Sequence, residues 1–151
     1  MPETADEGAP ALFSVGYEGR DLSDFVELLQ ENGVTVLLDV RLNASSRKPG
    51  FSKKRLTTAL AAVGIGYHHA RALGNPRDNR EPFHSADPRP GLQVFRALLA
   101  GDDAGAELGH LAELLETERV AVFCFERDHH RCHRQVIVDR VRADVPVVRL
   151  D

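Results

Sequence analysis

The chain has 151 residues, a hydrophobic share of 42%, a charged share of 28% and a formal net charge of -4 at pH 7. This size and balance are typical of one soluble globular domain, and they exclude a protein that coats nucleic acid through bulk positive charge. No apolar run approaches the roughly 20 residues of a membrane span, so we expect no membrane partner.

The amino end begins with residues 1–10, which are small and acidic, contain two prolines and lack a periodic apolar pattern. This composition predicts a flexible tail ahead of a single domain at residues 11–151. No secretory signal is visible, so we expect a cytoplasmic protein whose two cysteines are free thiols.

The first elements of the domain are predicted to be a strand, a helix and a second strand. Residues 11–15 form a short apolar strand that ends at Gly16. Asp21 can cap the following helix, and Gly33 can end it. Residues 34–40 are almost continuously apolar, as in a strand covered on both faces.

The middle of the chain continues with a helix that Ser52 can cap and Gly64 can end, and with a third strand at residues 65–68. Residues 71–90 are rich in proline and charge and show no convincing period. A loop of such length is uncommon in a compact domain, so we interpret it as a lid or a functional excursion.

The last third of the chain again alternates helices and strands. The pattern predicts helices at residues 92–99 and 108–115, a strand at 120–125, a helix at 135–143 and a strand at 145–150. Strands that alternate with helices favour parallel pairing with right-handed crossovers. We therefore predict a three-layer α/β domain with a mostly parallel sheet of about five strands and helices on both faces.

A basic segment follows the second predicted strand. Six basic residues and no acidic residue lie between Arg41 and Arg55, which can hold an anionic ligand or form a solvated surface. Asp39 and Arg41 point the same way at the end of the strand, and a guanidinium suits carboxylate or phosphate. Alternatively, Asp39 pairs with Arg41 or Arg47 and only fixes the loop.

The turn after the first strand, Gly16-Tyr17-Glu18-Gly19-Arg20, is a second candidate for anion binding. Glycines allow close approach of backbone amides to a ligand, and the amino end of the next helix favours an anion. A plain turn explains these glycines as well.

The run from Cys124 to Arg134 contains both cysteines and three of the seven histidines. We expect Cys132 in the first turn of the last helix, where the helix dipole and neighbouring arginines lower the pKa of a thiol and favour a nucleophile. Glu126 can act as an acid, a base or a clamp on an arginine, and His133 can move protons. Cys124 is equally explained as a core thiol.

Two other kinds of site are disfavoured by spacing. The seven residues between Cys124 and Cys132 match no common zinc motif, and adjacent histidines rarely both bind one ion, so we predict no metal. The Cys-x5-Arg loop of phosphatases and sulfurtransferases also fails, since from Cys124 that spacing reaches His130 and not an arginine.

Several short motifs together resemble the domain of unknown function 488 family. The resemblance extends from Leu12 to Leu150 and rests on Gly16-Tyr17-Glu18-Gly19, Asp39-Val40-Arg41, Ser45-Ser46-Arg47, Phe51-Ser52-Lys53, Leu73-Gly74-Asn75-Pro76 and Cys124-x-Glu126 with Cys132-His133-Arg134. It implies a small prokaryotic α/β domain without an established activity. The motif residues carry over to Gly16, Asp39, Arg41, Ser46, Arg47, Cys124, Glu126, Cys132, His133 and Arg134.

The chain departs from the family pattern at Ala44 and Asn75, where many members have proline and glycine, and His129 and His130 lie outside that pattern. All the motifs follow strands, so a parallel sheet should gather them at its carboxyl edge. We expect an enzyme acting on a phosphorylated or nucleotide-like substrate. The alternatives are a binding module that senses a nucleotide or nucleic acid without chemistry, and a structural role within a larger assembly.

In the enzyme hypothesis, anionic groups are bound by Arg41, Arg47 and Arg134, and Glu126 performs acid/base chemistry. Cys132 is a nucleophile or a polar anchor, and His133 assists proton transfer. Gly16, Tyr17, Asp39, Ser46 and Cys124 complete the predicted binding site. The sequence leaves both the cofactor and the oligomeric state open.

Overall fold

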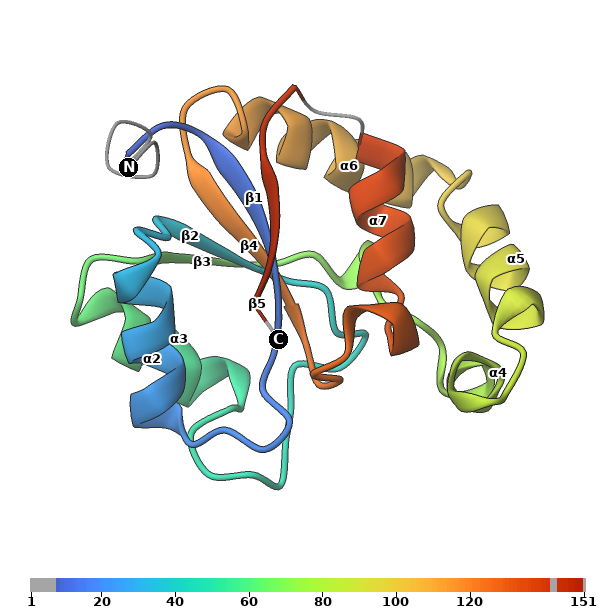
Figure 1. Cartoon of the computed structure of the whole chain (residues 1–151), viewed down its shortest axis with the longest axis horizontal. Coiled ribbons are helices and arrows are strands. Elements are labelled where there is room, and N and C mark those ends of the chain that lie inside the picture. The colour runs from blue at the N-terminus through green and yellow to red at the C-terminus, as the bar shows by residue number, and fades with distance from the viewer. Residues whose placement is uncertain (1–7, 142–143, 151) are drawn as a thin grey trace.

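The computed structural model describes residues 8–141 and 144–150, and its centre is a parallel sheet (Figure 1). Its strands lie in the order β3-β2-β4-β1-β5, and every described pairing is parallel. They are β1 (Ala11–Gly16), β2 (Val36–Asp39), β3 (Gly66–His69), β4 (Arg119–Cys124) and β5 (Val147–Leu150).

Helices cover both faces of this sheet (Figure 1). One layer holds α2 (Leu22–Glu31) and α3 (Lys53–Ala61). The opposite side carries α4 (Arg80–His84), α5 (Arg89–Leu98), α6 (Asp102–Leu114) and α7 (Arg134–Val141). The predicted three-layer α/β class is confirmed.

The two faces of the sheet bury separate apolar clusters because successive strand residues point to opposite sides. Phe13 and Phe123 pack with Phe25 of α2 on one face. Leu12 and Val122, each one residue away along its strand, pack on the other face against the second layer of helices. Both sides of β1 and β4 are therefore apolar, which explains their almost continuous hydrophobic sequences.

The predicted ends of the first helices agree with the structure in most details. The Asp21 carboxylate accepts a hydrogen bond of 2.8 Å from the Asp24 amide at the start of α2. Gly33 and Gly64 have positive φ angles of 67° and 76°, which favour glycine after a helix. Ser52 occupies the cap position of α3, but its side chain makes no capping hydrogen bond.

The segment 71–90, predicted to lack structure, contains two 3-10 turns, Arg71–Leu73 and Arg77–Asn79, followed by α4. These three elements are too short to produce a periodic pattern in the sequence. Asn75 and Asn79 are buried and hold the segment together, because the Asn79 amide donates to Asn75 Oδ1 at 2.8 Å. The predicted loop is thus an ordered excursion.

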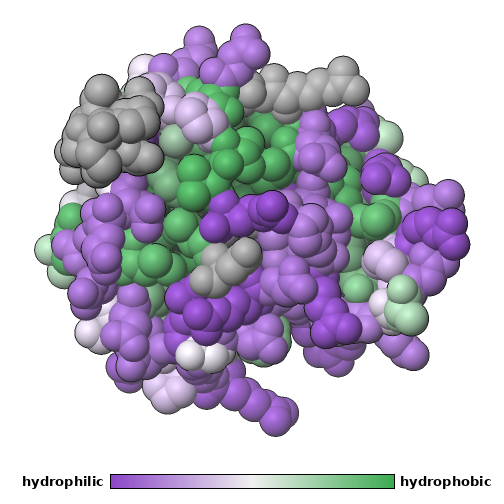
Figure 2. Space-filling view, viewed as in Figure 1, coloured by the Kyte–Doolittle hydropathy of each residue, from purple (hydrophilic) through white to green (hydrophobic). Residues whose placement is uncertain are grey.

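Most of the tail predicted at residues 1–10 lies outside the described residues, as do the last two positions of the helix predicted at 135–143. Across the described ranges, no helix has the length and apolar character needed to cross a bilayer. Val147 and Val148 of the edge strand β5 are exposed. An apolar patch is visible in the region of this strand (Figure 2).

Candidate functional site

The loops after β1 and β4 meet at the carboxyl edge of the sheet. The strand register pairs Gly16 with Cys124, and the amide of Tyr17 donates to the Cys124 carbonyl at 3.2 Å. A Cβ atom on Gly16 would collide with the backbone of Glu126. Glycine is therefore required at this position by close packing of two backbones, without any ligand.

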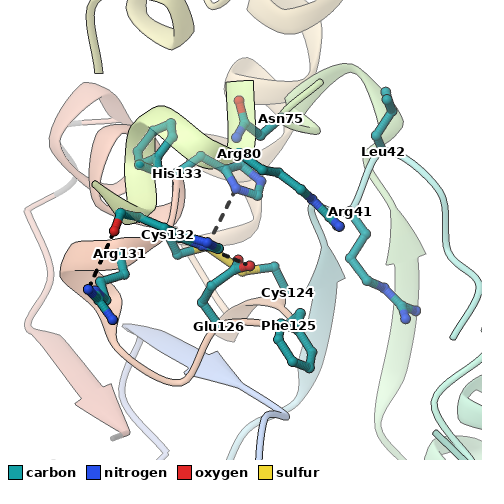
Figure 3. Close-up of a pocket in the computed structure, with 12 residues that line it drawn as sticks. Arg41, Leu42, Asn75, Arg80, Cys124, Phe125, Glu126, Arg131, Cys132 and His133 are labelled. Carbon is teal, nitrogen blue, oxygen red and sulfur yellow. Dashed lines mark hydrogen bonds and ion pairs between the residues drawn. A yellow bond between two sulfur atoms is a disulfide. The ribbon is translucent and has the colours of Figure 1, made fainter. Parts of the chain in front are cut away.

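A small cavity lies at the same edge, beyond β2 and β4 (Figure 3). Its volume of about 20 Å³ is room for roughly one water molecule or ion. Its lining combines three arginines, two histidines, both cysteines and one carboxylate with four uncharged side chains: Arg41, Leu42, Asn75, Arg80, Phe83, His84, Cys124, Phe125, Glu126, Arg131, Cys132 and His133.

The two cysteines are buried, and their sulfur atoms are joined as a disulfide. The expectation of two free thiols is therefore wrong for this structure. Cys132 also lies just before α7, after the 3-10 turn His129–Arg131, and not in the first turn of the helix. As a disulfide, Cys132 has no thiol to ionise, so the predicted nucleophile requires prior reduction.

His133 is buried between β2 and Cys132. Its Nε2 donates to the carbonyl oxygen of Val40 at 2.7 Å, since a carbonyl can only accept. The proton is then on Nε2, and the unprotonated Nδ1 lies 3.4 Å from Cys132 Sγ. Burial lowers the pKa of His133 to about 4, which outweighs the effect of the Val40 carbonyl and keeps the ring neutral at neutral pH.

Glu126 is the one carboxylate among the residues that line the cavity. Its Oε1 is 3.6 Å from Cys124 Sγ, and its Oε2 is 3.5 Å from Nε2 of His84. The side chain is largely covered, and it points toward the cysteines (Figure 3). A carboxylate in this position can exchange a proton with a group bound in the cavity.

Arg41 lines the cavity, but its charged group is engaged elsewhere. The guanidinium donates two hydrogen bonds to Asp39, at 2.9 and 2.7 Å, and one to the Phe51 carbonyl at 2.6 Å. Burial alone would lower the pKa of Arg41, but the Asp39 carboxylate raises it and keeps the guanidinium charged. Figure 3 shows this guanidinium pointing away from Cys124 and Cys132. The geometry favours the alternative in which Asp39 and Arg41 fix the loop.

Tyr17 and Ser46 lie in the same layer as that ion pair. The Tyr17 ring stacks on Phe51 with 4.5 Å between ring centres, and its hydroxyl donates to Ser46 Oγ at 3.1 Å. Arg47 is exposed and is not among the described residues that line the cavity. Arg134 is fully buried, and its Nη2 donates to the Arg127 carbonyl at 3.5 Å.

Most of the predicted site residues thus fall into two groups. Five of them border the cavity: Arg41, Cys124, Glu126, Cys132 and His133. Tyr17 and Ser46 are hydrogen-bonded on the opposite face of β2, and Asp39 is connected to them through the guanidinium of Arg41, which lies over the Tyr17 ring. Gly16, Arg47 and Arg134 belong to neither group.

Sequence reasoning missed four residues of the cavity wall that come from the segment 71–90, namely Asn75, Arg80, Phe83 and His84. The motif Leu73-Gly74-Asn75-Pro76 was a signal that this segment contributes. Gly74 packs so closely on the Leu42 backbone that a Cβ atom would collide with it. This contact places the whole excursion against the end of β2.

His129 is a further residue whose structural role was missed, because it lies outside the family pattern. It is buried, and its Nδ1 is 2.7 Å from the Ser14 hydroxyl in the middle of β1. Burial, with smaller contributions from nearby arginines, lowers the pKa of His129 to about 4. This histidine attaches the turn before Cys132 to the sheet.

Comparison with protein-family models gives one match, which covers residues 21–141 and is described as "Domain of unknown function DUF488". Comparisons with curated proteins and with solved structures give no match. The matched range includes most of the sheet, the excursion and the entire Cys124 to Arg134 run. The chain belongs to the DUF488 family.

Proposed function

We propose that this protein is an enzyme that acts on a phosphorylated or nucleotide-like anionic substrate at the carboxyl edge of its sheet. The observation that carries the proposal is the composition of one cavity wall, in which Glu126, Cys132 and His133 lie beside three arginines. Sheets of this kind bind ligands at this edge.

We assign anion binding to Arg80 and Arg131 in place of Arg41. The guanidinium of Arg41 is engaged by Asp39 and Phe51, whereas Arg80 and Arg131 have exposed side chains at the cavity wall. The cavity itself is too small for a phosphate group, so the phosphate would lie at its mouth. Guanidinium groups suit phosphate because they can donate two hydrogen bonds at once.

The chemical step rests on Glu126, assisted by His133. Glu126 is the acid or base, because it is the carboxylate nearest to the cavity. Cys132 is a nucleophile once reduced, or a polar anchor. Its sulfur lies 3.4 Å from Nδ1 of His133, and that ring is oriented by the Val40 carbonyl, as expected for a sulfur and base pair.

Binding is tested by calorimetric titration with inorganic phosphate and with a nucleoside monophosphate, using the free nucleoside as the uncharged comparison. We expect both phosphates to bind, and we expect Arg80→Gln and Arg131→Gln each to weaken binding by about 10-fold or more, the cost of one charged hydrogen bond. Arg96→Gln, on the exposed side of α5, is the matched control and should bind like the wild type. Wild-type affinity in both cavity variants would refute the proposal.

Turnover is tested with chromogenic phosphomonoesters and phosphodiesters on reduced protein. Glu126→Gln should keep phosphate binding and lose turnover, and Cys132→Ala should keep the fold and lose turnover or binding. Phosphate binding without turnover of any ester would favour the binding module.

A nucleotide or nucleic-acid binding module is the second candidate, and the exposed basic side chains Arg47, Lys53, Lys54 and Arg55 favour it. Phosphate contacts made by such residues weaken steeply as salt rises. Salt-dependent binding of a single-stranded oligonucleotide, reduced by Lys53→Gln with Lys54→Gln but not by Arg80→Gln, is the expected result for this module.

A further inference from the structure

We propose that the cavity, in its dithiol form, binds one thiophilic divalent metal ion such as zinc through Cys124 Sγ, Cys132 Sγ and His133 Nδ1. These three atoms lie within 4.8 Å of one another, and all three residues are buried. Two thiolates and one imidazole are a common ligand set for zinc.

The separation of Cys132 Sγ from His133 Nδ1 agrees with a shared ion. Zinc–sulfur bonds of about 2.3 Å and zinc–nitrogen bonds of about 2.0 Å place tetrahedral ligand atoms roughly 3.5 Å apart. Cys132 Sγ and His133 Nδ1 are separated by 3.4 Å. A hydrogen bond from a neutral thiol would also fit this distance, so the remaining features of the site decide the assignment.

The surroundings of His133 favour a ligand role. Its Nε2 donates to the Val40 carbonyl at 2.7 Å, which directs the free lone pair of Nδ1 toward the cysteines. Metal-binding histidines usually have such a partner on the other ring nitrogen, because it fixes both the proton and the ring orientation. Here the partner is the backbone at the end of β2, a rigid support.

The positions of the cysteines also favour an ion. Cys124 ends β4 and Cys132 lies just before α7, so the loop between them brings the two cysteines together. Their Cα atoms are 7.8 Å apart, beyond the roughly 4.4–6.8 Å that is usual for a disulfide. Two cysteines that share an ion do not need to approach so closely. The unusual sequence spacing, which argued against a metal, is thus compensated by the fold.

The disulfide and the metal site are alternative states of the same two sulfurs. A dithiol reductant supplies two electrons and two protons to the disulfide, which yields two thiols while the reductant becomes a disulfide. Binding of the divalent ion then releases the two thiol protons, because thiolates are the ligands. A reducing compartment would favour the dithiol form.

Three protein ligands leave a fourth position, as in catalytic zinc sites. The cavity beside the cysteines has about 20 Å³, which is room for one water molecule, and the ion itself would lie between the three ligand atoms. Glu126 Oε1 is 3.6 Å from Cys124 Sγ and is placed to accept a proton from that water. Cys132 is then a ligand and not a nucleophile. The metal site does not depend on the phosphate proposal, since the ion alone can be tested.

The experiment uses the whole protein, reduced with a phosphine under anaerobic conditions and titrated with cobalt(II). We expect one ion per chain, with a thiolate-to-cobalt absorption band and visible bands of a tetrahedral site, both removed by added zinc. Cys124→Ser, Cys132→Ser and His133→Gln should lose the band or bind about 100-fold more weakly. His130→Gln, an exposed neighbour in the same turn, is the control and should behave as the wild type.

The oxidised wild type provides a second control, since it keeps every side chain and should give no thiolate band. The surface group of His68, Glu107 and His110 cannot produce that band because it contains no sulfur. Two titratable thiols in the reduced protein without any cobalt band would overturn the metal site, as would an unchanged band in Cys132→Ser. Phosphate titration of metal-free protein is scored separately, so either proposal can fail alone.

Discussion

Arg41 holds the Asp39 carboxylate with two hydrogen bonds, of 2.9 and 2.7 Å, although the two residues are only two positions apart. Both side chains are buried. The same two-point pairing recurs on the surface, where Arg89 holds Asp87 at 2.8 and 2.9 Å. The chain thus contains the same ion-pair geometry once in a buried place and once on the surface. Comparing the two pairs separates the effect of burial on stability from the effect of the contact itself.

Asp39→Asn should lower the free energy of unfolding by about 3–5 kcal/mol, because it leaves the Arg41 charge buried without its partner. Asp87→Asn should leave it almost unchanged, since water solvates both groups. Urea unfolding of the two variants measures the difference. Equal losses would show that the burial of Asp39 has no energetic consequence.

Gly16→Ala should destabilise the protein by roughly 1–3 kcal/mol, because the added methyl group collides with the backbone of Glu126. The displaced loop should also shift Glu126 and weaken any ligand binding in the cavity. Gly109→Ala is the control, since its Cβ meets open space within α6 and alanine favours a helix by up to about 1 kcal/mol. Thermal unfolding measures both changes, which should have opposite signs.

Acid should destabilise the protein between pH 6.5 and about 4, partly through His129. Burial lowers the pKa of His129 from 6.5 to about 4, so the unfolded chain binds more protons in this interval. The contribution is complete above pH 6.5 and is lost as the pH falls toward 4. The charged or ionisable groups that act on the His129 ring are three basic residues and one acid: Arg134, His130, Arg149 and Asp139.

The measurement is the melting temperature of the wild type and of His129→Gln across this pH range. The slope due to His129 is worth roughly 1–2 kcal/mol over the interval, and it should vanish in the variant. The pKa of His133 is lowered to about 4 as well, so the His129→Gln variant should retain part of the pH dependence of the melting temperature. His130→Gln should keep most of the wild-type slope, because burial, and not His130, is the main cause of the lowered pKa of His129. Identical slopes in His129→Gln and the wild type would contradict the assignment.

Asn79→Ala should loosen the segment 71–90, because its side-chain amide donates to Asn75 Oδ1 and to the Gly91 carbonyl, at 2.8 and 3.1 Å. Leaving these buried acceptors without a donor costs about 1–3 kcal/mol. Hydrogen exchange should accelerate in α4 and the 3-10 turns while β1 and β4 stay protected. Exchange that is uniform across the chain would show that the segment does not open by itself.

The architecture was predictable because its signals are local. Apolar runs identified β1, β2 and β4, and the glycine at position 33 marked the end of α2. The structure of the segment 71–90 was not predicted, because two 3-10 turns and a five-residue helix are too short for a periodic pattern. Its order comes from tertiary contacts, such as Asn75 with Asn79, that no local pattern contains.

The candidate site was predictable only in part. The motif around Cys124 and Cys132 indicated the sheet edge at which the cavity lies, since residues after parallel strands gather there. The orientation of Arg41 was not predictable, because its choice between Asp39 and a ligand depends on burial. The placement of His84 beside Glu126 required the path of a segment with no periodic signal.

The end of β2 connects the two sides of the sheet. The Val40 carbonyl accepts from His133 next to the cavity, while Arg41, the next residue, packs its guanidinium over the rings of Tyr17 and Phe123 on the other side. We therefore expect a substitution among those aromatic residues to displace a carbonyl that orients a cavity histidine. Mutational screens scored only by activity will consequently recover positions that never touch a ligand, and a stability measurement on each variant is needed to tell the two kinds apart.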